Sequence, residues 1–169
     1  MAYGTDAQCR LVAKRILEDG DKPAIGMTEP GAGTNLTELS TRADSKGDGY
    51  LINGRKHWIT GGGISVTNLI FVRFYDENGK ERGIGGILVD KGHPGFTIGR
   101  VEDAMGLRGI PETELIFEDC LVPAENVVVM PSPEPVPNME GFKNLMYGYN
   151  GQRAGASAVA LGIAQGAHD

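Results

Sequence analysis

A short apolar run that breaks off abruptly stands at residues 24–35, Ala-Ile-Gly-Met-Thr-Glu-Pro-Gly-Ala-Gly-Thr-Asn. Its apolar part ends at Met27-Thr28, and the proline and glycines that follow stop a β-strand. Such a break leaves backbone N–H groups free to face a ligand, especially an anionic one. Taken alone, the motif fits an ordinary strand exit as well as a ligand-binding loop.

A second stretch, Lys-His-Trp-Ile-Thr at residues 56–60, places the only tryptophan of the chain two positions before a threonine hydroxyl. A single tryptophan in a small β-domain usually belongs to the core. Here Gly61-Gly62-Gly63 follows, which is either a flexible loop or a place where a planar ligand can approach the backbone. An aromatic face next to a small hydrogen-bonding group suits a flat ring with heteroatoms. Together the two stretches favour a ligand site.

From Pro23 to about Met130 the sequence alternates short β-prone runs with turn residues, which predicts an antiparallel β-barrel or sandwich. Asn53-Gly54 and Asp76-Glu77-Asn78-Gly79 are hairpin signals. A Rossmann site is not expected, because Leu36 stands where its fingerprint needs a third glycine. The candidate strands are residues 23–28, 39–45, 49–60, 68–75, 84–90, 96–102 and 113–129.

Helices are predicted on both sides of this β region. Residues 5–19 have apolar side chains at helical spacing, with Thr5 or Asp6 as a cap and Gly20 as a stop. Residues 131–138 contain four prolines and predict a stiff extended connector. A long helix rich in Ala and Gly is predicted for residues 140–168. It runs on without a stop signal, so the chain looks cut in a helix that expects packing partners.

Composition narrows the function classes. A net charge of −6 and a pI near 5.1 argue against nucleic acid and anionic membranes as partners. No apolar segment is long enough to span a bilayer. Cys9 and Cys120 are too few for a disulfide framework, so we expect a reducing compartment, either a bacterial cytoplasm or a mitochondrial matrix. The three histidines match no metal spacing, and no metal is expected.

The chain resembles the acyl-CoA dehydrogenase family over nearly its whole length. In that family a subunit has an N-terminal helical domain, a middle β-barrel and a C-terminal four-helix domain. The resemblance implies the end of the first domain at residues 1–22, an FAD- and acyl-CoA-binding β-barrel at 23–130, a connector at 131–139 and the first helix of the third domain at 140–169. It is carried by residues 27–34, 52–60, 105–108, 114–119, 122–127, 141–143 and 152–153.

The resemblance also implies a site. Trp58 would lie against the isoalloxazine ring of FAD, and Thr60 would hydrogen-bond near its N5. Thr34, where the family usually has serine, would touch both the cofactor and the thioester. The implied cofactor-binding residues are Ile25, Met27, Thr28, Gly33, Thr34, Trp58, Ile59 and Thr60, and the implied substrate-binding residues are Thr34, Asn150, Gln152 and Arg153.

No catalytic base is nominated within these residues. Gln152 stands where a minority of the family carries its catalytic glutamate, and in most members the base comes later, so we expect it beyond Asp169. The implied reaction of the complete enzyme is α,β-dehydrogenation of an acyl-CoA thioester to a trans-2-enoyl-CoA, with this piece alone inactive.

Other readings stay open. Enoyl-CoA reductase or acyl-CoA oxidase activity on the same fold is one alternative, and a non-catalytic β-barrel used for binding or assembly is another. The implied partners are an electron-transfer flavoprotein or another electron acceptor, and further copies of the chain in a homodimer or homotetramer.

Overall fold

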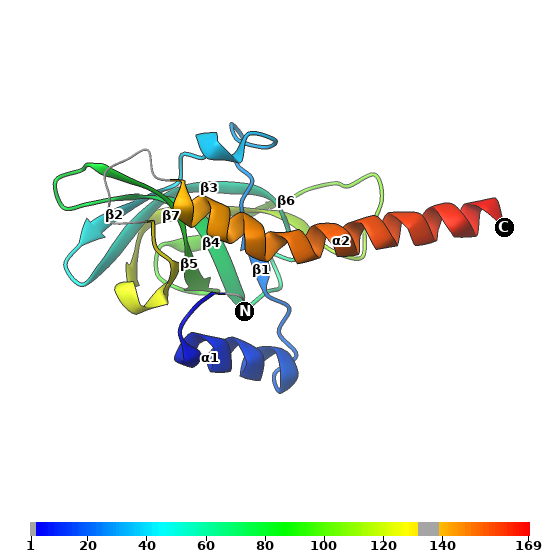
Figure 1. Cartoon of the computed structure of the whole chain (residues 1–169), viewed down its shortest axis with the longest axis horizontal. Helices are drawn as coiled ribbons and strands as arrows, with labels where there is room; N and C mark the ends of the chain where they lie inside the picture. Colours follow the sequence, from blue (N-terminus) through cyan, green and yellow to red (C-terminus); the bar gives the residue numbers. More distant parts are fainter. Residues whose placement is uncertain (1–2, 132–138) are drawn as a thin grey trace.

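A computed structural model describes residues 3–131 and 139–169. Its centre is an eight-stranded sheet with the strand order β6-β7-β3-β2-β4-β5-β8, and β1 pairs with β4 outside this path. One helix lies beside the sheet and another crosses it and extends well beyond it (Figure 1). The elements are α1 (Asp6–Leu17), β1 (Ala24–Gly26), η1 (Leu36–Glu38), β2 (Arg42–Lys46), β3 (Gly49–Thr60), β4 (Thr67–Tyr75), β5 (Glu81–Asp90), β6 (Phe96–Val101), β7 (Glu112–Pro123), η2 (Ala124–Asn126), β8 (Val127–Val129) and α2 (Glu140–His168).

The predicted fold class, mainly β with helical flanks, is confirmed, but the sheet differs from a closed antiparallel barrel. Its described strand order begins at β6 and ends at β8, so the sheet is open. β4 pairs in parallel with both β1 and β2, whereas the other pairings are antiparallel. The parallel pair arises because β3 reverses the direction of β2 and β4 reverses it again. β4 then lies beside β2 instead of beside β3.

One of the two predicted hairpin turns is wrong. Asn53-Gly54 lies inside β3, where the pairing with β7 shifts register between Ile52 and Gly54. Gly54 has a φ of 149°, and a Cβ there would come within 2.6 Å of Thr41 Oγ1. The residue is therefore a glycine because the backbone bulges against a neighbour. The reversal between β2 and β3 occurs instead at Gly47-Asp48, with Gly47 at a φ of 62°.

The second predicted hairpin, Asp76 to Gly79, joins β4 and β5 as expected. The carboxylate of Asp76 accepts hydrogen bonds from the backbone N–H groups of Asn78 and Lys80, both at 3.0 Å. Gly79 supplies the positive φ, 71°, that such a turn requires.

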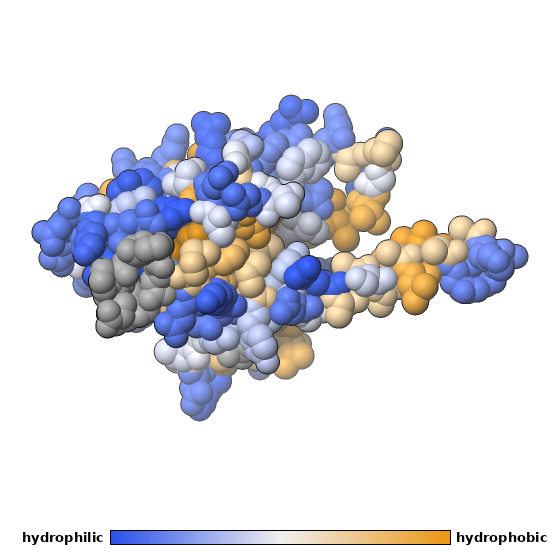
Figure 2. Space-filling view, turned by 45° about the horizontal axis from the view of Figure 1, so that its top comes forward, coloured by the Kyte–Doolittle hydropathy of each residue, from blue (hydrophilic) through white to orange (hydrophobic). Residues whose placement is uncertain are grey.

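Both predicted helices are present. α1 begins with a capping box, in which the side chains of Thr5 and Gln8 each accept a hydrogen bond from the other residue's backbone N–H. α2 begins and ends where the sequence predicts. It packs on the sheet through Gly141 and Leu145, and from Gly151 onward all its residues are exposed. This outer half projects from the body with apolar side chains on its surface (Figure 2), among them Val159, Leu161 and Ile163.

The remaining boundary differences are small. The run predicted as one strand at residues 113–129 is β7, the short helix η2 and β8, because the chain turns after Pro123. The predicted connector at 131–138 lies outside the described residues except for Pro131. No helix in the described ranges is both long and apolar enough to cross a membrane.

The sheet separates two apolar clusters, since successive side chains of a strand face opposite sides. On β4, Ile70 and Phe74 belong to a large cluster with residues of β3, β5 and β7. Phe71 instead faces α2 and packs with Leu145 in the second cluster, to which Ile25 and Met27 also contribute. The residues that follow β1 are thus fixed next to α2.

Candidate functional site

A cavity of about 270 Å³ lies where the ends of β1 and β3 meet the middle of α2. Three of its lining residues carry a hydroxyl and one carries a side-chain amide, and the others are apolar side chains and the indole of Trp58. No carboxylate is among the described residues that line it. The lining residues are Pro23, Ile25, Met27, Thr28, Trp58, Ile59, Thr60, Tyr149 and Gln152.

Most of the residues implied by the resemblance are brought together here, although they come from three separate segments. They are Ile25, Met27, Thr28, Trp58, Ile59, Thr60 and Gln152. Four others do not line this cavity. Gly33 and Thr34 are exposed in the loop after β1, and Asn150 and Arg153 are exposed on α2, where an Arg153 guanidinium N–H donates to Asn150 Oδ1 at 3.4 Å.

A buried ion pair holds the loop after β1 against β3. Lys56 Nζ lies 2.7 Å from Glu29 Oε1 and also donates to the carbonyl oxygen of Met27 at 3.2 Å. The side chains of Lys56 and Glu29 are 0% and 3% exposed. Glu29 further accepts the backbone N–H groups of Ser40 and Thr41, at 2.6 and 2.9 Å. Both ends of the loop are therefore fixed by one carboxylate.

The titration of the pair follows from its surroundings. Burial by itself raises the pKa of Glu29, but the Lys56 charge and the hydrogen bonds from Lys56, Thr41 and Ser40 outweigh it and hold that pKa at about 2. Burial lowers the pKa of Lys56 to about 8, against the opposing attraction of Glu29. At neutral pH the two groups are therefore both charged.

Trp58 reaches the cavity because β3 carries a bulge. Lys56 pairs with Leu115 and Ile59 with Thr113, so His57 and Trp58 together oppose the single residue Glu114. Such an insertion re-aims a side chain. Trp58 has a φ of 56°, in the left-handed region that costs a non-glycine residue about 1–3 kcal/mol. Its side chain is half exposed, which leaves part of the indole open to a ligand.

The side chains of Thr60 and Glu112 are hydrogen-bonded to each other at the end of β3. The Thr60 hydroxyl donates to Glu112 Oε1 at 2.7 Å. Its one proton is thereby directed at the carboxylate, while its oxygen lone pairs can still accept a hydrogen bond from a ligand. Glu112 thus orients a cavity residue.

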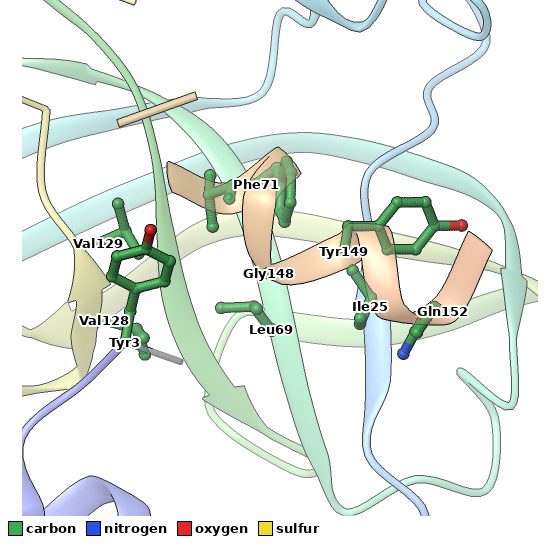
Figure 3. Close-up of a pocket in the computed structure, with 10 residues that line it drawn as sticks. Tyr3, Ile25, Leu69, Phe71, Val128, Val129, Gly148, Tyr149 and Gln152 are labelled. Carbon is green, nitrogen blue, oxygen red and sulfur yellow. The ribbon is translucent and has the colours of Figure 1, made fainter. Parts of the chain in front are cut away.

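A second, mainly apolar cavity of about 170 Å³ lies beside the first, between the start of α2 and the sheet. Figure 3 shows Ile25 on β1 and Tyr149 and Gln152 on α2 close together on the right of the view. These three residues line both cavities. The remaining walls are Tyr3, Leu69, Phe71, Val128, Val129, Leu145 and Gly148.

Sequence reasoning missed Glu29 and Lys56 as a structural pair and gave no role to His57. The available signal was weak: Lys56 lies in β3 between the buried residues Ile52 and Ile59, and a buried lysine needs a carboxylate. Nothing local identifies Glu29 as that partner, since the two residues meet only when β1 and β3 pack together. In the described ranges no three His, Cys, Asp or Glu side chains are grouped so as to hold a metal ion.

Comparison with known proteins points to one family. A family model described as "Acyl-CoA dehydrogenase, middle domain" matches residues 24–120. The chain is 49% identical over 166 residues to 3-sulfinopropanoyl-CoA desulfinase of Advenella mimigardefordensis, covering 96% of this chain and 40% of that protein. It is 40% identical over 169 residues to acryloyl-CoA reductase (NADH) of Anaerotignum propionicum, covering 99% and 41%.

Among solved structures, butyryl-CoA dehydrogenase from Megasphaera elsdenii aligns with a TM-score of 0.82 and 36% identity, covering 96% of this chain and 41% of that one. The chain thus spans about two fifths of the length of the relatives it matches. These named relatives come from bacteria, and none of them supports the mitochondrial alternative.

Proposed function

Because the chain belongs to the acyl-CoA dehydrogenase family, we propose that it forms the flavin-facing part of an FAD-dependent enzyme that acts on an acyl-CoA thioester. The principal activity we propose for the native-length protein is α,β-dehydrogenation to a trans-2-enoyl-CoA. The observation that carries the proposal is the convergence of Met27-Thr28, Trp58 to Thr60 and Gln152 on one cavity.

The donor set of the cavity fits the isoalloxazine ring of FAD. A flat, largely apolar ring with polar edges needs an aromatic neighbour and a few hydrogen-bonding groups. The half-exposed Trp58 supplies the first, and Thr28, Thr60 and the fixed backbone after β1 supply the second. When bound, FAD would supply the hydride-accepting chemistry that no amino-acid side chain provides.

We propose that Thr34, Asn150, Gln152 and Arg153 contact the acyl-CoA, with Gly33 and Thr34 also touching the cofactor. Support comes from α2, which places Gln152 in the cavity and Asn150 and Arg153 one turn or less away on the same helix. Arg153 is exposed and carries a charge suited to an anionic ligand.

Proton abstraction at the α carbon needs a positioned carboxylate. The described lining of the cavity offers Gln152, an amide that cannot take up the proton, and no acid. We therefore propose that the base comes from a segment beyond Asp169, packed against α2.

We further propose the division of the chain that the resemblance implies. Residues 1–22 would end an N-terminal helical domain, 23–130 would be the FAD- and acyl-CoA-binding domain, 131–139 the connector, and 140–169 the first helix of a C-terminal helical domain. The exposed outer half of α2 supports the last assignment, because its apolar side chains suit burial against further helices.

A reduced flavin needs a partner that accepts its electrons. We propose an electron-transfer flavoprotein or another redox partner, and a homodimer or homotetramer as the assembly. The acryloyl-CoA reductase relative, named with NADH, makes the reverse reaction, reduction of an enoyl-CoA, an alternative direction.

A second candidate function is desulfination of 3-sulfinopropanoyl-CoA. It is favoured by relatives of that name at 48–49% identity, compared with 40% for the acryloyl-CoA reductase. Replacement of the C–S bond by C–H, with water taken up and sulfite released, balances without an external oxidant. An amide at Gln152, in place of a carboxylate, is compatible with such a reaction.

One assay on the native-length gene product separates these functions. The purified protein is examined for flavin absorbance and then mixed anaerobically with butyryl-CoA, crotonyl-CoA plus NADH, and 3-sulfinopropanoyl-CoA. Dehydrogenation predicts bleaching of the flavin by butyryl-CoA, and desulfination predicts sulfite release without lasting bleaching. Protein that carries no flavin and converts none of the thioesters would contradict both and favour a non-catalytic module.

A further inference from the structure

The indole of Trp58 is only partly covered by the protein. The bulge removes it from the regular alternation of β3, half of its surface is exposed, and it borders the cavity. An unsupported side chain at such a place would move among rotamers within nanoseconds. Its ring contacts the ring of His57, with centroids 5.4 Å apart and planes tilted by 36°.

His57 is itself restrained at both ends. Its backbone N–H donates to the carbonyl oxygen of Thr28 at 2.8 Å, which ties the bulge to the loop after β1. Its ring Nε2 lies 2.9 Å from Glu102 Oε1, and these side chains are only 29% and 11% exposed. The imidazole therefore cannot rotate without breaking a contact.

Glu102 is in turn anchored. Its backbone N–H donates to the carbonyl oxygen of Glu112 at 2.8 Å, and its second carboxylate oxygen lies 3.3 Å from Arg100 Nε. Glu112 is the residue that accepts the Thr60 hydroxyl. One backbone pairing, Glu102 with Glu112, thus supports both Trp58 and Thr60.

From this chain of contacts we infer that His57 is a positioning residue. Held by Glu102, its ring fixes the indole of Trp58 in one orientation at the mouth of the cavity, before any ligand arrives. A flat ligand then meets a preorganised aromatic face. The entropy cost of ordering Trp58 therefore does not lower the affinity. The inference concerns the free protein and does not depend on the identity of the ligand.

Time-resolved fluorescence anisotropy of the chain tests this directly, since Trp58 is its only indole. We expect His57→Ala and Glu102→Ala each to increase the amplitude of the subnanosecond depolarisation at least twofold. The double variant should show no further increase, because both changes break one linkage. His57→Gln should restore part of the order, since its amide can still donate to Glu102. His168→Ala, at an exposed site near the end of α2, is the matched control and should change nothing.

Far-UV circular dichroism checks that each variant is folded. Should His57→Ala not fold, Glu102→Ala and His57→Gln decide the matter. Unchanged depolarisation in the folded Glu102→Ala variant, or additive effects in the double variant, would overturn the inference. Titration with FAD is a separate readout: absence of quenching in the wild type would count against the proposed cofactor and leave the anisotropy result standing.

Discussion

Glu29 and Lys56 show how a single buried contact shapes the site. Their ion pair is inaccessible to solvent, and it fixes the carbonyl of Met27 and both ends of the loop after β1. A buried pair adds little net stability compared with apolar residues, but it is costly to break from one side. Its role here is to fix the position of the backbone that faces the cavity.

Breaking the pair from one side should be strongly destabilising. Glu29→Gln leaves a buried ammonium without a counter-charge, and we expect a loss of about 3–5 kcal/mol in the free energy of unfolding. Glu29→Gln combined with Lys56→Met should recover much of that loss. Urea titration measures both. Asp44→Ala, which breaks the exposed pair with Arg42, should cost less than about 1 kcal/mol and serves as the control.

The same pair predicts that the folded chain loses stability at low pH. The pKa of Glu29 is about 2 in the folded chain, below its ordinary value of 4.5. The folded state therefore binds fewer protons than the unfolded state between these values, so its contribution to stability is complete above pH 4.5 and is lost as the pH falls toward 2. Unfolding free energies from pH 6 to 2.5 check this. A decline as steep in Glu29→Gln as in the wild type would contradict the assignment.

Gly54 allows the strand β3 to pass close to Thr41. Gly54→Ala puts a Cβ into the side chain and backbone of Thr41 at 2.6–2.8 Å and forces a φ of 149° on alanine. We expect a loss of at least about 1–3 kcal/mol from the backbone conformation alone. Thermal or urea unfolding measures it. Gly106→Ala, which meets nothing within 4 Å, should be nearly neutral, and equal effects of the two would argue against a steric cause.

The outer half of α2 should open easily. Residues from Gly151 onward are exposed and none beyond Gln152 lines either cavity, so mainly helix propensity holds them, and glycines weaken it by up to ~1 kcal/mol each. Hydrogen exchange followed by mass spectrometry should show fast exchange there and strong protection in β3 and β4. Gly155→Ala with Gly162→Ala should slow it, since neither Cβ meets an obstacle. Protection equal to that of β3 in dilute protein would reveal a partner for this surface.

These elements also show what the sequence could and could not predict. Alternation and turn residues placed both helices and most strands within a few residues, because those signals are local. The direction of Trp58 was not predictable, since the bulge at His57 and Trp58 depends on the register of β7. The wrongly predicted hairpin at Asn53-Gly54 has the same origin, because the glycine is required by the close approach of Thr41 and not by a turn. Local patterns already joined residues 24–35 and 56–60 in one ligand site, and the resemblance to a family added Gln152.

At the scale of the molecule, the site as described lacks an acid. We expect the 169-residue chain with added FAD and an electron acceptor to form no enoyl-CoA from butyryl-CoA, because no described carboxylate lines the cavity. The native-length gene product, assayed in parallel by enoyl-CoA formation, is the control. Turnover by the shorter chain would mean that a base lies within it, with Glu112 the first residue to replace.

The edge of β4 has a consequence for how the molecule is made. Ala24 to Gly26 pair with Asn68 to Ile70, and Arg42 to Asp44 pair with Arg73 to Tyr75, so two early strands share one later strand end to end. During synthesis β1 has no partner strand until β4 has left the ribosome, whereas β2 can first pair with β3. The loop between β1 and β2 is consequently shaped late, by closure of long-range pairings that fold slowly. The hairpins β2–β3 and β4–β5, each closed by its own turn, are the natural places for folding to start.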